Sequence, residues 1–145
     1  MAQTQLLALV LGVLIVGLAI VLGIEVFHRQ ERQHRRDRAY LFCMETATKA
    51  RAYYRMPRSL GGGEFSFEGF DFTKIGLAPS QNPLLYEDPE GTRYELQPEG
   101  RERLRLVASY REPGGIVYLA VCLIEPDTMY LYRSFAEAQA EELPR

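Results

Sequence analysis

The hydrophobic and polar positions of this chain follow three successive patterns, of which the first is the simplest. Leu6 to Ile24 is a run of 19 apolar residues that contains no charge. A helix needs about 20 apolar residues to cross roughly 30 Å of hydrocarbon, and this run has nearly that length. The run therefore predicts a transmembrane helix. A signal peptide would need a basic start and a small-residue cleavage site, and neither accompanies the run.

The second pattern is a long amphipathic continuation of the same helix. Residues 25–56 contain no proline or glycine, so the helix is predicted to run to Arg55 and to end before Pro57. Residues 28–38 are polar on every side, whereas an apolar stripe with steps of three and four is formed by Tyr40, Cys43, Ala47, Ala50 and Tyr54. Such a stripe lies on one helix face and is expected to pack on a partner surface. The apolar side chains expected to meet a second surface are Leu41, Phe42 and Met44.

The third pattern has a period of two and follows a loop rich in glycine and phenylalanine. Residues 57–91 are predicted to form this connecting loop, with Gly61–Gly63 as a flexible exit from the helix. The phenylalanines expected to hold the loop on the core are Phe65, Phe67, Phe70 and Phe72. Four strands are predicted over 93–97, 103–110, 116–124 and 129–132, separated by turns that contain proline. A short helix is predicted over 135–142, with Ser134 and Glu137 as its capping box.

Together these patterns predict an α+β protein in which a long N-terminal helix, hydrophobic and then amphipathic, packs on a four-stranded antiparallel β-meander. Its parts are a helix over 1–56, a connecting loop over 57–91, and a sheet head with the short C-terminal helix over 92–145. Within the helix, residues 5–27 form the membrane half and residues 28–56 the amphipathic half. In the second strand, Leu104 and Leu106 are expected to face inward and Arg105 outward.

Charge is divided unevenly between the two parts of the chain. Residues 1–58 contain nine Arg or Lys against four Asp or Glu, whereas residues 59–145 contain eight against fifteen. The overall charge of −2 is thus a near-cancellation of a basic part and an acidic part, which argues against a nucleic-acid binder with a basic domain. With two cysteines, the chain is also not a disulfide-dense secreted miniprotein.

Five arginines follow the apolar run directly, and no basic residue precedes it. They are Arg29, Arg32, Arg35, Arg36 and Arg38. Because Glu31 and Asp37 lie among them, we expect ion pairs within the helix or between subunits rather than contacts with lipid headgroups or nucleic acid. Basic residues normally stay on the cytoplasmic side of a membrane, so the same arginines favour a cytoplasmic position for residues 29–145.

No catalytic constellation is recognised in the sequence, and no cofactor or metal ion is expected. His28 and His34 are six residues apart, which does not place them on one helix face. The acidic side chains that follow the loop are Glu87, Asp88 and Glu90. Their spacing is not that of an EF-hand and indicates an exposed turn. Cys43 lies on the apolar stripe and Cys122 on the third predicted strand, so the two could meet in the core, either as a disulfide or as two packed thiols.

In its layout the chain resembles a type IV pilin or pseudopilin. Proteins of that family have an N-terminal helix that is apolar in its first half and amphipathic in its second, followed by a loop and a small antiparallel sheet packed on the helix. Here the helix corresponds to residues 1–55, the loop to residues 56–83 and the sheet to residues 92–133. The resemblance therefore covers nearly the whole chain.

The resemblance implies roles for particular residues of the helix. Those expected in the membrane, and later in a filament core, are Leu6, Leu7, Leu9, Val10, Leu14, Ile15, Leu18, Ile20, Leu22 and Ile24. Met1 and Gln5, the latter at a position where the family often has glutamate, are expected to form the N-terminal assembly contact. Either Met1 is the mature N-terminus or the protein departs from the processing of that family. Gly17 and Gly23 mark the segment where the helix is expected to loosen, and the five arginines are expected to pair with acidic heads of neighbouring subunits.

The function expected from this resemblance is that of a non-enzymatic subunit of an extracellular type IV pilus-like filament. The protein is expected in the inner membrane and then, through pilus assembly machinery, in a helical homopolymer at the cell surface, with roles such as adhesion. Helices would form the filament core and the acidic sheet heads its outer surface, with no nucleic acid as partner. From a different class, the alternative is a single-pass membrane protein with a cytoplasmic or periplasmic interaction or scaffold domain.

Overall fold

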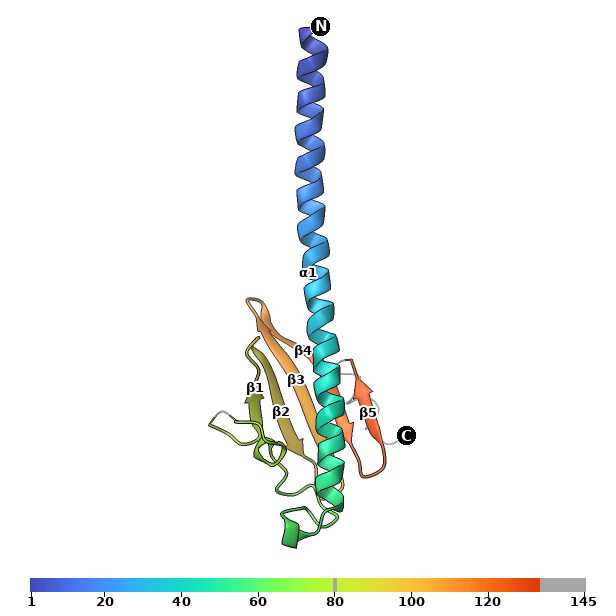
Figure 1. Cartoon of the computed structure of the whole chain (residues 1–145), viewed down its shortest axis with the longest axis vertical. Helices are drawn as coiled ribbons and strands as arrows, with labels where there is room; N and C mark the ends of the chain where they lie inside the picture. The colour runs from blue at the N-terminus through green and yellow to red at the C-terminus, as the bar shows by residue number, and fades with distance from the viewer. Residues whose placement is uncertain (80, 134–145) are drawn as a thin grey trace. The chain divides into compact units, whose positions relative to one another are not determined.

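The computed structural model describes residues 1–79 and 81–133, and the short helix predicted over 135–142 lies outside them. Its helices are α1 (Ala2–Arg55) and the short 3-10 helices η1 (Arg58–Leu60) and η2 (Phe72–Ile75) (Figure 1). The chain divides into two compact units, Met1–Arg35 and Arg36–Arg145, and α1 contributes to both. With the sheet described below, the fold is of the predicted α+β class.

α1 ends where the sequence predicts, and the loop that follows closes its terminus. The N–H of Gly63 donates to the carbonyl of Tyr53 (2.9 Å), and that of Phe65 donates to the carbonyl of Tyr54 (2.8 Å). The last carbonyls of a helix have no partner within the helix, so the loop supplies one. Gly62 and Gly63 are buried, and a Cβ at either position would overlap backbone atoms. The glycines therefore form a close-packed corner and not the flexible exit that we expected.

The sheet has five antiparallel strands in chain order, one more than predicted. They are β1 (Leu85–Glu87), β2 (Thr92–Pro98), β3 (Leu104–Glu112), β4 (Gly115–Ile124) and β5 (Met129–Tyr132). The additional strand, β1, lies in the segment that was assigned to the connecting loop. Its three residues are too few to show an alternating pattern, and it forms by pairing with β2, where Leu85 lies opposite Glu95.

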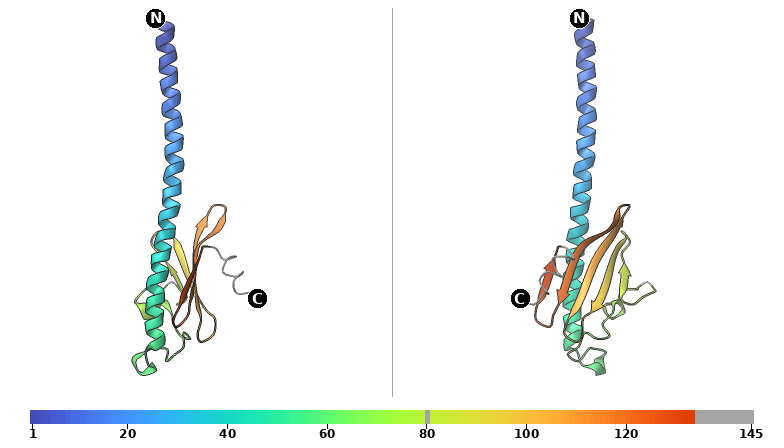
Figure 2. Two further views of the ribbon diagram at one scale, coloured as in Figure 1. Left: turned by 90° about the vertical axis from the view of Figure 1, so that its right-hand side faces the viewer. Right: turned by 180° about the vertical axis from the view of Figure 1, so that it is seen from behind.

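Residues 36–55 of α1 lie along one face of the sheet (Figures 1 and 2). The helix residues buried there are Ala39, Cys43, Thr46, Ala47, Ala50 and Tyr54. Most of them are small, which allows a close approach of helix and sheet. The sheet contributes Tyr94, Leu96, Leu104, Leu106, Ala108, Ala120, Cys122 and Ile124 to the same core. The packing predicted for the apolar stripe is thus confirmed, with Tyr40 half-buried at its start.

Two side chains differ in burial from the prediction. Phe67, Phe70 and Phe72 are buried as expected, but Phe65 is 68% exposed. Phe65 has a positive φ of 64°, its N–H donates to the carbonyl of Tyr54, and its ring meets Tyr54 edge-on while remaining largely in solvent. Arg105 was expected to be exposed but is buried, and Glu99 holds its guanidinium at 2.6 Å. A buried charge is tolerated only with such a partner.

Tyr94 of β2 gives the head a predicted dependence on alkaline pH. Burial, followed by the charge of Asp88, raises the pKa of Tyr94 well above its usual range. Tyrosine in the unfolded chain titrates near pH ~10. Between that pH and the higher pKa of the folded state only the unfolded chain releases the proton, so the free energy of unfolding falls by up to about 1.4 kcal/mol per pH unit.

We expect Tyr94→Phe to weaken this alkaline loss of stability. The measurement is denaturant unfolding of wild type and variant between pH 8 and 11, with pH 8 as the reference because the phenol is neutral there in both states. An equal decline of the two proteins above pH ~10 would show that Tyr94 does not cause it.

Candidate membrane and assembly surfaces

The apolar run of α1 is exposed over its whole length. Its large side chains, including all ten that were predicted for a membrane or a filament core, have exposed fractions between 48% at Val10 and 69% at Leu7. The helix is long and apolar enough to cross a membrane, and none of its most apolar segment is buried within the structure. Burial of one such Leu, Ile or Val side chain is worth about 1.5–3 kcal/mol. This surface therefore requires a cover, either lipid or protein.

The helix is regular through Gly17 and Gly23, so the loosening that we predicted there is absent from the structure. Glycine lowers the intrinsic helix propensity by about 1 kcal/mol relative to alanine, but it keeps the N–H group that proline lacks. Without a proline in this run, the ladder of backbone hydrogen bonds continues. A Cβ at either glycine would meet no other atom within 4 Å. These glycines therefore leave the helix uninterrupted and its surface open.

Met1 and Gln5, which were predicted to form an assembly contact, lie exposed at the start of α1. The N–H of Gln5 donates to the carbonyl of Met1 (3.3 Å), and the hydroxyl of Thr4 donates to the same oxygen (3.2 Å). The first turn contains no acidic residue that could offset the positive end of the helix dipole. The assembly role of Met1 and Gln5 stays a prediction.

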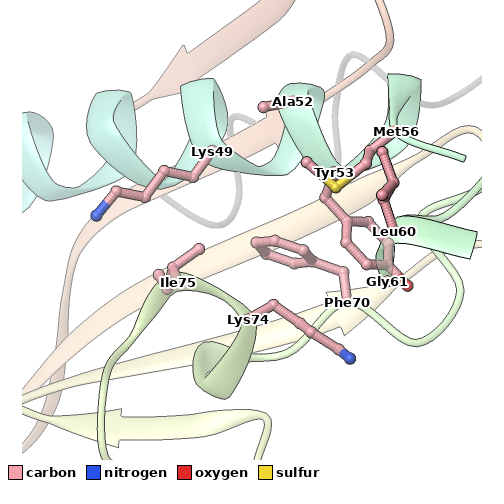
Figure 3. A pocket seen from close by; sticks show the side chains of 9 residues that line it. All are labelled: Lys49, Ala52, Tyr53, Met56, Leu60, Gly61, Phe70, Lys74 and Ile75. Atoms are coloured by element: carbon pink, nitrogen blue, oxygen red, sulfur yellow. The ribbon is translucent and has the colours of Figure 1, made fainter. Parts of the chain in front are cut away.

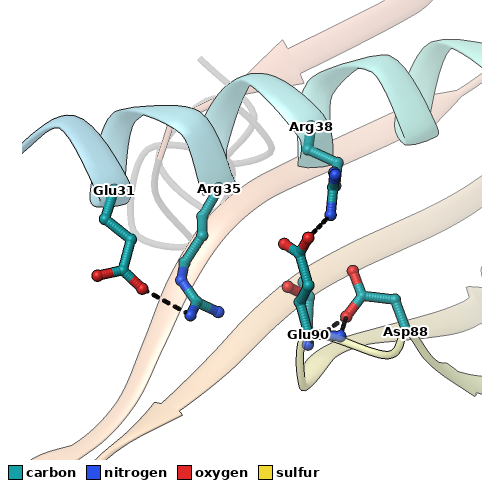
Figure 4. A network of polar contacts seen from close by, with 6 residues as sticks. Glu31, Arg35, Arg38, Asp88 and Glu90 are labelled. Carbon is teal, nitrogen blue, oxygen red and sulfur yellow. Dashed lines mark hydrogen bonds and ion pairs between the residues drawn. The ribbon is translucent and has the colours of Figure 1, made fainter.

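Arg29 and Arg35 have ion pairs within one turn of α1. Arg29 contacts Glu25 at 3.1 Å and Arg35 contacts Glu31 at 2.9 Å, both with i, i+4 spacing. The hydrogen bond and the charge of Arg35 lower the pKa of the Glu31 carboxyl (Figure 4). Pairs with i, i+4 spacing on a helix surface stabilise the helix only weakly. The prediction of pairing within the helix is therefore confirmed for these two arginines.

Arg38 contacts the head of its own chain, through Glu90 in the turn between β1 and β2 (Figure 4). The carboxylate of Asp88 shapes that turn by accepting the N–H groups of Glu90 (2.9 Å) and Thr92 (2.8 Å). The acidic residues around position 88 thus form a turn, as predicted. The sequence did not indicate that this turn carries a partner for Arg38, because the two residues are distant along the chain.

A hollow of about 540 Å³ lies where the end of α1 meets the loop, and its lining was not predicted (Figure 3). It is lined by Lys49, Ala52, Tyr53, Met56, Leu60, Gly61, Phe70, Lys74 and Ile75. The lining is mainly apolar and includes no carboxylate, thiol or imidazole, while two lysines add positive charge. Its polar side chains are Lys49, Lys74 and the phenol of Tyr53, and the rest of the lining is apolar.

Leu41 and Met44 on α1 are 68% and 52% exposed, whereas Phe42 packs on the core. Phe42 stacks with Tyr86 at 5.7 Å and tilts against Tyr94 at 4.0 Å between ring centroids. Of the three side chains expected to meet a second surface, Phe42 therefore finds that surface in β1 and β2. Leu41 and Met44 present apolar area to solvent.

Within residues 1–79 and 81–133, no three His, Cys, Asp or Glu side chains are grouped so that they could hold a metal ion. His28 and His34 are both exposed on α1. The chain has no match among protein-family models, curated proteins or solved structures. Its function is therefore inferred from the surfaces described above.

Proposed function

We propose that this protein is a pilin-like structural subunit of an extracellular filament. The observation that carries the proposal is the apolar half of α1, whose side chains are exposed on all sides. The same helix continues without a break into its amphipathic half, whose apolar stripe is buried against the sheet. In a single subunit, lipid covers the apolar half. In a filament, the same half of other copies covers it.

The physical argument rests on the apolar area that has to leave water. A run of 19 apolar residues is too large to remain exposed outside a bilayer, since each buried Leu or Ile side chain is worth about 1.5–3 kcal/mol. Bundling of identical helices buries this area without any other partner. Repetition of one head-to-tail contact that does not close on itself produces an open helical polymer.

The arginine segment gives such a polymer a charged contact. The basic N-terminal part of the chain and the acidic head carry opposite net charges, so the head of one copy attracts the arginine segment of the next. Pairs such as Arg29 with Glu25 are largely exposed, and they leave the arginine accessible to a second carboxylate. We therefore assign the specificity of the contact between subunits to the arginine segment. The affinity between subunits comes from the apolar run.

Neutralising Arg29, Arg32 and Arg36 together as glutamines is expected to abolish filaments while the head remains folded. Glutamine keeps the helix propensity of arginine, so the change removes charge and not structure. The measurement is electron microscopy of material sheared from cells, combined with thermal unfolding of the purified variant.

The matched control replaces three exposed arginines of the head, Arg93, Arg101 and Arg111, with glutamine. This variant loses the same charge outside the arginine segment and is expected to form filaments. Normal filaments from the helix variant would contradict the proposal, and so would loss of filaments in both variants to the same degree.

The second candidate function is a single-pass membrane protein with a cytoplasmic interaction domain. The observation that favours it is the position of five arginines directly after the apolar run, with no basic residue before it. Protease treatment of intact cells and of spheroplasts distinguishes the two functions. Digestion of the head from outside the inner membrane supports the filament subunit, whereas a head that is cleaved only after lysis supports the cytoplasmic domain.

A further inference from the structure

The two cysteines lie in different elements and meet in the centre of the core. Cys43 is on α1, and Cys122 is on β4 between Leu106 of β3 and Leu131 of β5. Both are completely buried free thiols of the same core cluster, and interaction with the Cys122 thiol is the first cause of the raised pKa of Cys43. The chain has no other cysteine, so each thiol has a single possible partner within the molecule.

The helix face around Cys43 makes this contact possible. Its neighbours one turn away on the stripe are Ala39 and Ala47, which keep α1 close to the sheet. Opposite them, Ala108 and Ala120 pair across β3 and β4, next to the row that contains Cys122. Small residues on both sides allow a close approach of α1 and the sheet around the two cysteines, which belong to one core cluster.

From this geometry we infer that Cys43 and Cys122 are a disulfide site that closes as the head folds outside the cytoplasm. The bond would tie α1 to β4 and so lock the helix onto the sheet. The location of the head rests on the proposed function, whereas the bond itself rests only on the position of the two thiols. Disulfides persist in extracytoplasmic compartments and are rare in the cytosol.

The chemistry requires a disulfide-containing oxidant, either a thiol oxidase of the envelope or a small disulfide such as oxidised glutathione. One cysteine thiolate attacks the oxidant's disulfide, forms a mixed disulfide and releases one thiol. The second cysteine then attacks the mixed disulfide, which forms the Cys43–Cys122 bond and releases the second thiol. Two electrons and two protons pass from the cysteines to the oxidant, which leaves as two thiols.

Burial decides when this reaction takes place. The neighbouring Cys122 thiol and burial raise the pKa of Cys43, so the folded protein contains little of the reactive thiolate at this position. The folded core also excludes the oxidant, because neither sulfur is exposed. The bond therefore forms during folding, before α1 and the sheet exclude the oxidant.

The test is oxidative refolding of the full chain in detergent, from the reduced and urea-unfolded state, with a mixture of oxidised and reduced glutathione. We expect a mass lower by two hydrogens, no thiol that reacts with a maleimide in denaturant, and a melting temperature about 10 °C above that of the reduced protein. The C43A/C122A variant controls for redox effects elsewhere and is expected to melt at one temperature in both conditions. Two reactive thiols in the refolded wild type would overturn the inference.

A second measurement separates the bond from the location of the head. Cells are quenched in acid, and their thiols are then labelled with a maleimide in denaturant. A protein without reactive thiols supports both the disulfide and the extracytoplasmic head. If the bond forms during refolding but both cysteines are reduced in cells, the site is real and the proposed extracytoplasmic function is wrong.

Discussion

Replacement of Leu14 and Leu18 with arginine is expected to remove the protein from the membrane fraction and to abolish filaments. Both side chains lie near the middle of the apolar run, 64% and 63% exposed, and one helical turn apart on the same face. An arginine at the centre of a membrane helix costs about 2.5–3.5 kcal/mol, and each leucine that is lost contributed about 0.5 kcal/mol. The two substitutions together therefore raise the free energy of membrane insertion by about 7 kcal/mol. This is comparable to the total favourable insertion free energy of such a helix.

The matched control is the Leu41→Arg and Met44→Arg pair on the same helix. These residues have similar exposure, 68% and 52%, but they lie in the unit that carries the sheet. The control adds the same charge and is expected to remain in the membrane fraction. The measurement is fractionation of cells followed by carbonate extraction. If both double variants stay in the membrane, the apolar run of α1 is not the anchor.

Phe67→Ala is expected to destabilise the head by about 3–5 kcal/mol, the range for truncation of a buried phenylalanine. The ring is fully buried and packs on Tyr54 near the end of α1, with 4.8 Å between ring centroids. The N–H of Phe67 donates to the carbonyl of Arg101 (2.8 Å), which ties the loop backbone at this position to the turn between β2 and β3. Denaturant unfolding followed by near-ultraviolet circular dichroism measures the loss.

Phe65→Ala provides the comparison, because Phe65 also contacts Tyr54, at 5.9 Å and edge-on, but is 68% exposed. An edge-to-face aromatic pair is worth about 0.5–1.5 kcal/mol, so this variant should lose far less stability. The two residues are two positions apart in one loop and undergo the same chemical change. Equal losses would mean that burial of Phe67 does not anchor the loop.

The parts of the fold that the sequence predicted are those with a long or repeated pattern. The apolar run and the proline-free stretch after it determined α1 and its end at Arg55. The apolar stripe predicted which helix face packs on the sheet, and four of the five strands were recognised by alternation or by their turns. In each case many residues carry the same signal, so no single position decides the outcome.

The features that were missed depend on residues that are far apart in the sequence. β1 has three residues and exists because an edge of β2 was available to pair with it. Phe65 resembles its neighbouring phenylalanines in sequence, and only the path of the backbone turns its ring to solvent. Arg105 is paired with Glu99, six residues away along the chain, and Arg38 with Glu90 in the turn between β1 and β2.

By itself, the sequence determined the apolar and amphipathic halves of α1, the α+β class, and the opposite charges of the two parts of the chain. These follow from local composition and periodicity, which act over a few turns of helix or one strand. Only the tertiary structure decided that Arg38 contacts Glu90, how the loop lines the hollow at the end of α1, and that β1 pairs with β2. Such contacts depend on the packing of segments that are separated along the chain, and packing is set by shape and not by the order of residues alone.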